Sequence, residues 1–267
     1  MLSEIKKISS LLLSVAFSSI GFIASITVTV LAAREVSSNP LFVGFPNAVG
    51  VGGAVLGTRM IYLISKNNSQ LNALAFTFLI GAFGGAIMFY SLIVDSFVLL
   101  LFGAFILGIG QSATLQTRYA ASFVASEKFK ATALSLAVWF SVFGSVFGPR
   151  MVGSYSNFFE NIFNSELIVG YVIALVGMLF AASSLFIFTS KKSILRSPSN
   201  LESELNNQNS NKKNGNLLSL LLVLNHFTMV VIMSATPLHI QDIGETVQLV
   251  GIIISYHTLG MFLFSPI

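Results

Sequence analysis

Long uncharged apolar stretches alternate with short polar segments along most of this chain. Many of the stretches reach about 20 residues, the length that a helix needs to cross a hydrocarbon core of about 30 Å. The longest polar interruption covers residues 191–216 and contains five basic residues and seven asparagines. Because such a segment buries too little apolar surface to offset its chain entropy, the pattern predicts a solvated linker between two blocks of membrane spans.

The apolar pattern predicts six helices before this linker and two after it. We expect them at residues 11–33, 41–64, 71–94, 97–119, 131–153 and 167–190, and then at 217–237 and 247–267. A polar loop is expected over 154–166. The predicted organisation is a six-helix bundle at 1–190, a linker at 191–216 and, at 217–267, the first two helices of a second bundle. Since Ile267 ends inside an apolar stretch, this second bundle is expected to be incomplete and the chain to be a fragment or a truncated product.

Composition supports an all-α, multispanning membrane protein with the lipid bilayer as its main environment. Hydrophobic residues make up 54% of the chain and charged residues 9%, well below the charged share of a soluble domain. The basic pI has a simpler cause in membrane orientation than in nucleic acid, which is not expected as a partner. The chain has no cysteine, which excludes disulfides and thiolate metal sites.

Basic residues divide unequally between the two sides of the predicted spans. Arg34 and Arg150 fall on one side and twelve lysines and arginines on the other, five of them in the linker. The positive-inside rule therefore predicts a cytoplasmic N-terminus and a cytoplasmic linker in a plasma (inner) membrane protein.

An internal repeat supports the division at the linker. Shifting the chain by 207 residues aligns residues 11–60 with 218–267 without a gap, and eight of these 50 positions are identical. The identical pairs include Gly44 with Gly251 and Gly53 with Gly260. An ungapped match of two helices to two helices favours parallel repeats related by an axis along the membrane normal.

The fifth predicted helix carries the most informative motif, GSVFGPRMVG. It contains Gly144, Gly148, Pro149 and Gly153. Glycines four residues apart allow a neighbouring helix to approach the backbone closely, and the proline removes one helix hydrogen bond. An ordinary packed and kinked helix would explain the same residues.

This motif, together with the six-helix unit, the long linker and the repeat, resembles the major facilitator superfamily, and the motif itself is similar to one of its drug-proton antiporter branch. The resemblance implies a complete six-helix N-terminal bundle and alternating access about a midplane site. The chain departs from the family at three points. Ile61 and Tyr62 stand where the loop after the second helix usually has Asp and Arg, Ala104 stands where antiporters have arginine, and one extra residue separates Pro149 from Gly153.

Two histidines are the candidate proton-coupling groups. His226 and His257 lie about 13 Å from their helix entries by helix rise, near the expected midplane. Histidine exchanges protons near neutral pH, so the pair could link transport to a proton gradient. The alternative is that each imidazole only hydrogen-bonds a neighbouring helix.

Further polar groups are candidates for a cavity and a gate. An amphipathic substrate could contact amides and an aromatic ring, and the cavity candidates are Gln111, Gln116, Trp139 and Asn225. Interhelical hydrogen bonding would also account for the amides. Arg118 and Glu127 could form a cytoplasmic gate, although snorkelling to headgroups would explain Arg118 equally.

The sequence predicts a secondary transporter that exports small amphipathic compounds, driven by a proton or other ion gradient. Uptake of a polar metabolite or sugar is the alternative, and an inactive truncated membrane protein is a third. We expect no enzyme activity, no cofactor and no metal, because the chain has no metal-ligand cluster, phosphate-binding loop or spaced nucleophile and base.

Overall fold

The structure, a computed structural model, describes residues 2–37, 39–67, 69–188 and 212–263. Within them the chain forms eight α-helices and two short 3-10 turns. The α-helices are α1 (Leu2–Val36), α2 (Phe45–Asn67), α3 (Gln70–Ile93), α4 (Phe97–Val124), α5 (Lys130–Phe163), α6 (Ile168–Phe188), α8 (Lys212–Asp242) and α9 (Val247–Phe262).

The all-α membrane architecture predicted from the sequence is confirmed. Among the described residues, seven helices are long and apolar enough to cross a membrane. The eighth, α9, has 16 residues and rises about 24 Å, less than a full hydrocarbon core. Its expected continuation over 264–267 lies outside the described residues.

The structure corrects the predicted end of the fifth helix. Residues 154–163 were expected in a polar loop, but α5 continues without interruption to Phe163. The ring of Phe163 packs on Phe89 of α3 and on Phe159 of its own helix, so this turn has apolar partners that keep it ordered. Asn164 then ends the helix with a left-handed backbone (φ 57°).

The seventh predicted helix is also longer than expected. It begins at Lys212, inside the predicted linker, and passes through Pro237 to Asp242. Proline removes one backbone hydrogen bond, a loss that membrane helices tolerate where neighbours pack against them, and Pro237 is buried. Of the predicted linker, residues 191–211 lie outside the described residues.

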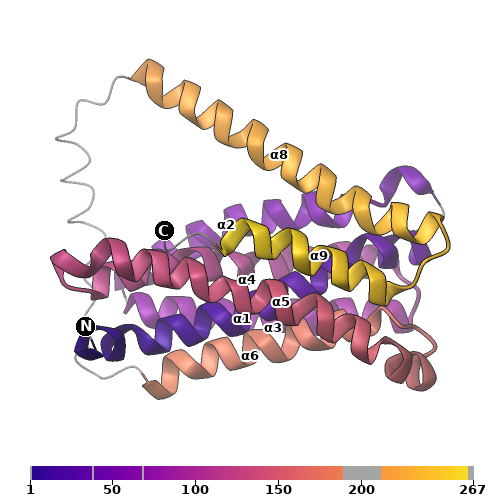
Figure 1. Ribbon diagram of the computed structural model, residues 1–267, viewed down its shortest axis with the longest axis horizontal. Helices are drawn as coiled ribbons and strands as arrows, with labels where there is room; N and C mark the ends of the chain where they lie inside the picture. Colours follow the sequence, from indigo (N-terminus) through magenta and orange to yellow (C-terminus); the bar gives the residue numbers. More distant parts are fainter. Residues whose placement is uncertain (1, 38, 68, 189–211, 264–267) are drawn as a thin grey trace.

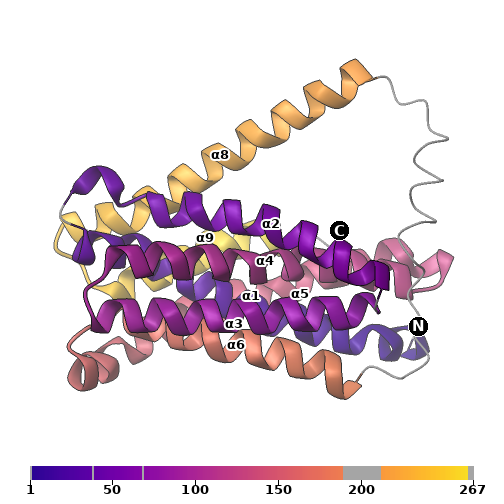
Figure 2. The ribbon, with the colours of Figure 1, turned by 180° about the vertical axis from the view of Figure 1, so that it is seen from behind.

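Helix α1 forms the centre of the bundle, with α4, α5 and α6 packed around it (Figure 1). Small residues allow these close approaches: Gly21 meets Ala174 and Gly177 of α6. Seen from behind, α2 lies beside α4, and α8 diverges from the bundle toward the end that holds the N-terminus (Figure 2). We call this end the basic end. The opposite end, where the α1–α2, α5–α6 and α8–α9 connections lie, is the acidic end.

Candidate functional site

A cavity of about 110 Å³ lies between the first bundle and α8. Helices α1, α2, α4 and α8 supply most of its wall. The lining residues are Phe22, Ser25, Ile26, Thr29, Pro46, Asn47, Gly50, Val51, Met88, Ala104, Leu107, Gly108, Gln111, His226, Met229, Val230, Met233 and Ser234. The cavity wall therefore combines helices of the first bundle with α8, the first helix of the second repeat.

Close glycine contacts position the cavity wall that α2 and α4 form. A Cβ atom on Gly108 of α4 would overlap the backbone of Gly50 of α2. Three residues along α2, Gly53 is packed in the same way against the carbonyl of Phe105. These contacts bring Asn47 and Gln111 to the same cavity.

A hydrogen bond crosses the cavity wall between α2 and α8. The amide nitrogen of Asn47 donates to the hydroxyl oxygen of Ser234 at 2.9 Å, and both side chains are partly buried. The two residues lie 187 positions apart. This bond ties the first bundle to the first helix of the second repeat.

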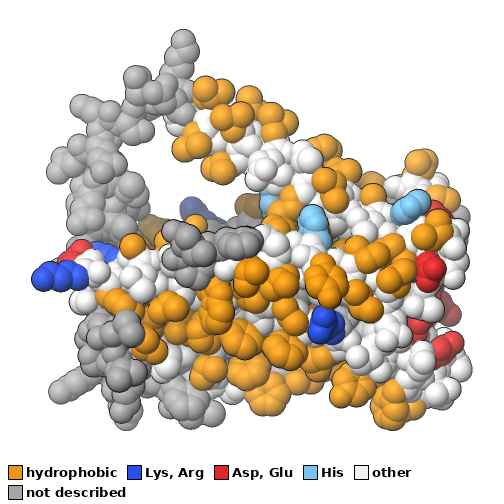
Figure 3. All heavy atoms as spheres, in the orientation of Figure 1, with side chains coloured by type: hydrophobic (Ala, Val, Ile, Leu, Met, Phe, Trp, Pro, Cys, Tyr) orange, Lys and Arg blue, Asp and Glu red, His pale blue; other side chains and the backbone are white. Residues whose placement is uncertain are grey.

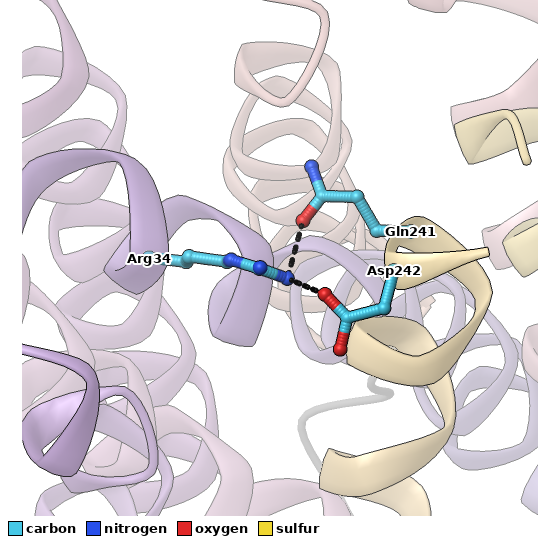
Figure 4. A network of polar contacts seen from close by, with 3 residues as sticks. All are labelled: Arg34, Gln241 and Asp242. Atoms are coloured by element: carbon cyan, nitrogen blue, oxygen red, sulfur yellow. Dashed lines mark hydrogen bonds and ion pairs between the residues drawn. The ribbon is translucent and has the colours of Figure 1, made fainter. Parts of the chain in front are cut away.

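An ion pair at the acidic end makes a second link between the repeats. One guanidinium nitrogen of Arg34, at the end of α1, lies 2.6 Å from Asp242 and 3.4 Å from the side-chain oxygen of Gln241 at the end of α8 (Figure 4). Gln241 is 207 residues from Arg34, so Arg34 contacts its own repeat counterpart. Two polar links therefore hold α8 to the bundle between the cavity and the acidic end.

Negative charge gathers around that ion pair. Asp and Glu side chains cluster at the acidic end of the visible face (Figure 3). In the loop between α5 and α6, burial and then repulsion from Glu160 raise the pKa of Glu166 above its ordinary value. Toward the basic end, by contrast, the residues of α8 from Leu217 to Thr228 are all exposed.

The structure brings together two of the predicted site residues. Gln111 and His226 both line the cavity. The other predicted residues lie outside it: Gln116 is half-buried on α4, Trp139 packs on Phe140 and Phe143 of α5, and Asn225 and His257 are exposed on α8 and α9. The two candidate histidines thus do not share this cavity.

The two gate candidates lie on separate elements near the basic end. Glu127 forms an ion pair with Lys130 at 2.7 Å in the turn before α5. Arg118 is half-buried within α4. In the described part of the chain, no three histidine or carboxylate side chains form a set that could hold a metal ion.

The motif of α5 packs two neighbouring helices. Gly144 lies against Ser19 of α1, and Gly148 lies against Ile20 of the same helix. On the adjacent face, Gly153 contacts Gln248 and the carbonyl of Pro149 meets Gly251, both on α9. Arg150, on an exposed position, lies 6.0 Å from the ring centre of Tyr256. The motif therefore holds α9 against the first bundle.

Sequence reasoning missed Asn47 and Ser234. Asn47 is the only amide side chain in the apolar stretch 41–64, a signal that could have identified it. Ser234 has no comparable signal, because a single serine in a membrane helix can also bond a carbonyl of its own helix. The partnership depends on where α8 lies beside the first bundle, which the sequence does not state.

Comparisons with known proteins found two relatives, both in Bacillus subtilis (strain 168). The chain is 28% identical to the uncharacterized MFS-type transporter YddS over 273 residues, covering 98% of this chain and 63% of that protein. It is 27% identical to the uncharacterized MFS-type transporter YdeG over 263 residues, covering 95% and 61%.

The chain thus spans a little over three fifths of the length of these relatives. No protein-family model matches it. No solved structure matches it. The described helices form an all-α membrane fold, which agrees with the similarity to two proteins that are named MFS-type transporters.

Proposed function

We propose that this protein is a gradient-driven secondary transporter that exports small amphipathic compounds across the plasma membrane. The observation that carries the proposal is the cavity between the first bundle and α8, with Gln111 and His226 in its wall. A site between two repeats allows alternating access when one repeat moves against the other.

The packing of α8 supports this mechanism. Its half toward the acidic end is held by Asn47 and Arg34, and its half toward the basic end is exposed. Figure 3 shows a space between α8 and the bundle toward the basic end. This arrangement corresponds to a form closed at the acidic end, and opening that end would require both polar links to break.

His226 is the proposed coupling residue. Its side chain lines the cavity, so a proton on the imidazole and a substrate would occupy neighbouring positions. Histidine exchanges protons near neutral pH, which makes the group suitable for a proton gradient. His257, which lies outside the cavity, would act only if another conformation brings it closer to the substrate path.

Dye accumulation tests the proposal. Cells that express the protein from its own gene should hold less of an uncharged fluorescent dye than cells with an empty vector, and a protonophore should abolish the difference. His226→Ala should lose this effect, while His239→Ala, at the acidic end of α8, should keep it. Dye that rises on expression would instead indicate uptake, and equal dye in all cells would reject transport of this class.

A further inference from the structure

The polar side chains of the cavity include a set of hydrogen-bond acceptors. The hydroxyl groups of Ser25 and Thr29 donate to carbonyls of their own helix at 2.8 and 2.7 Å. Each hydroxyl proton is therefore occupied, and only the oxygen lone pairs remain for a ligand. The side-chain oxygen of Asn47 is a third acceptor, because its amide nitrogen bonds Ser234.

Donors come from α4 and α8. Gln111 carries an amide, His226 an imidazole and Ser234 a hydroxyl, and all three side chains line the cavity. Among the described residues, none of these three groups donates a side-chain hydrogen bond within the protein. A ligand in the cavity could thus both donate to and accept from its wall.

The cavity wall carries no fixed charge. None of its 18 described lining residues is Asp, Glu, Lys or Arg. A cation that entered would lose part of its hydration to a mostly apolar wall without gaining a counter-charge, which is unfavourable. Protonation of His226 would add repulsion. An uncharged molecule avoids both costs.

The apolar part of the wall tolerates different shapes. Met88, Met229 and Met233 line it together with Phe22. Methionine side chains are unbranched and polarizable, so they adapt to irregular ligands. The hydrogen-bonding groups would then orient the ligand, while the methionines accept its body.

We propose that the cavity binds uncharged amphipathic molecules that carry both a hydrogen-bond donor and an acceptor, and that it rejects permanent organic cations. This inference rests on the proposed function and names its substrate class. The missing element for cation transport is a carboxylate, and Gln111 is a lining position where one can be added with little change in shape.

Paired dyes test the inference in cells that express the protein from its own gene. The wild type should lower accumulation of Nile red, which is uncharged, at least threefold, and should leave that of ethidium, a permanent cation, unchanged. Gln111→Glu should lower ethidium accumulation at least threefold. Gln116→Glu makes the same change on α4 outside the cavity and should leave ethidium accumulation unchanged. Ser234→Asp provides a second carboxylate in the wall if Gln111→Glu is not found in the membrane.

The outcomes separate this inference from the proposed function. Equal export of both dyes by the wild type would overturn the selectivity and leave export standing. Export of neither dye would overturn export itself. Variants that reach the membrane and export Nile red, yet gain no ethidium export, would also contradict the inference, as would an equal gain from Gln116→Glu.

Discussion

The two helix pairs related by the repeat, α1–α2 and α8–α9, are packed very differently. In the apolar stretch of α1, 72% of the residues are buried, whereas in that of α8 only 6% are. Helix α1 is enclosed by α4, α5 and α6, while α8 contacts mainly α1 and α9. Similar sequences thus have different burial, because a membrane helix gains its burial from its neighbours and not from its own apolar pattern.

The glycines that occur at equivalent positions of both repeats show the same contrast, and the packed copy lies in the first repeat for one pair and in the second repeat for the other. Gly53 packs against the backbone of α4, while no atom of the described residues lies near its counterpart Gly260. Conversely, Gly251 packs against Pro149, while its counterpart Gly44 is open. A small residue in the sequence therefore indicates that close approach is allowed, and the neighbouring helices decide which copy uses it.

The largest expected effect comes from filling the contact at Gly53. In Gly53→Val the side chain would overlap the backbone of Phe105, which cannot move without separating α2 from α4. Overpacking of this kind costs about 3 kcal/mol. The melting temperature of the detergent-solubilised protein should fall clearly, while Gly260→Val should leave it unchanged. Equal melting temperatures for the two variants would contradict the packing contrast.

A smaller effect is expected at the second pair of glycines. Gly251→Val should loosen α9 from α5 at a cost of about 1–3 kcal/mol, and Gly44→Val should cost little because its surroundings are open. Since the chain has no cysteine, a single Ser255→Cys can report on this interface. The side chain at this position is buried in the protein without Gly251→Val. The thiol should therefore react faster with a maleimide when Gly251→Val is added, and not when Gly44→Val is added.

Loss of the bond between Asn47 and Ser234 should have a moderate effect. Asn47→Ala removes a partly buried hydrogen bond, worth about 1 kcal/mol, and one of the two polar links between α8 and the bundle. The melting temperature should fall slightly. Thr58→Ala, which removes only a bond within α2, is the matched control, and an equal fall in both variants would argue against the link.

The smallest effect is expected for the ion pair at the acidic end. Arg34 and Asp242 side chains are about half exposed (46% and 54%), so the pair should contribute less than about 1 kcal/mol. Arg34→Asp should lower the melting temperature slightly at low salt, and adding Asp242→Arg should restore it. High salt should reduce the difference, since exposed charges are screened. If the double variant melts no higher than Arg34→Asp alone, the ion pair does not stabilise the protein.

The sequence predicted much of this fold because membrane helices have a strong length and composition signal. All eight helices lie where the apolar stretches predicted them, with ends that differ by several residues. The largest differences, at residues 2–10 and 154–163, arise because polar and aromatic residues near a membrane surface are compatible with either a loop or a further helical turn. Phe163 is ordered by Phe89, a contact between distant parts of the chain.

The candidate site was less predictable. Gln111 and His226 could be selected from the sequence because amides and imidazoles are rare in apolar stretches. Three further residues were also selected because their side chains are unusual in apolar stretches, yet they lie on other faces of their helices: Gln116, Trp139 and Asn225. The rotation of each helix about its axis depends on packing, as at Gly53 and Gly108, and the sequence alone did not reveal it.

Crosslinking between α2 and α8 in native membranes tests most directly whether the second repeat closes the cavity. In the cysteine-free chain, Asn47→Cys with Ser234→Cys should form a crosslink on oxidation or with a short bifunctional thiol reagent. Asn47→Cys with Phe227→Cys, on an exposed position of α8 nearer the basic end, should not. Crosslinking that is absent at Ser234, or equal at both positions, would contradict the packing of α8 on which the cavity depends.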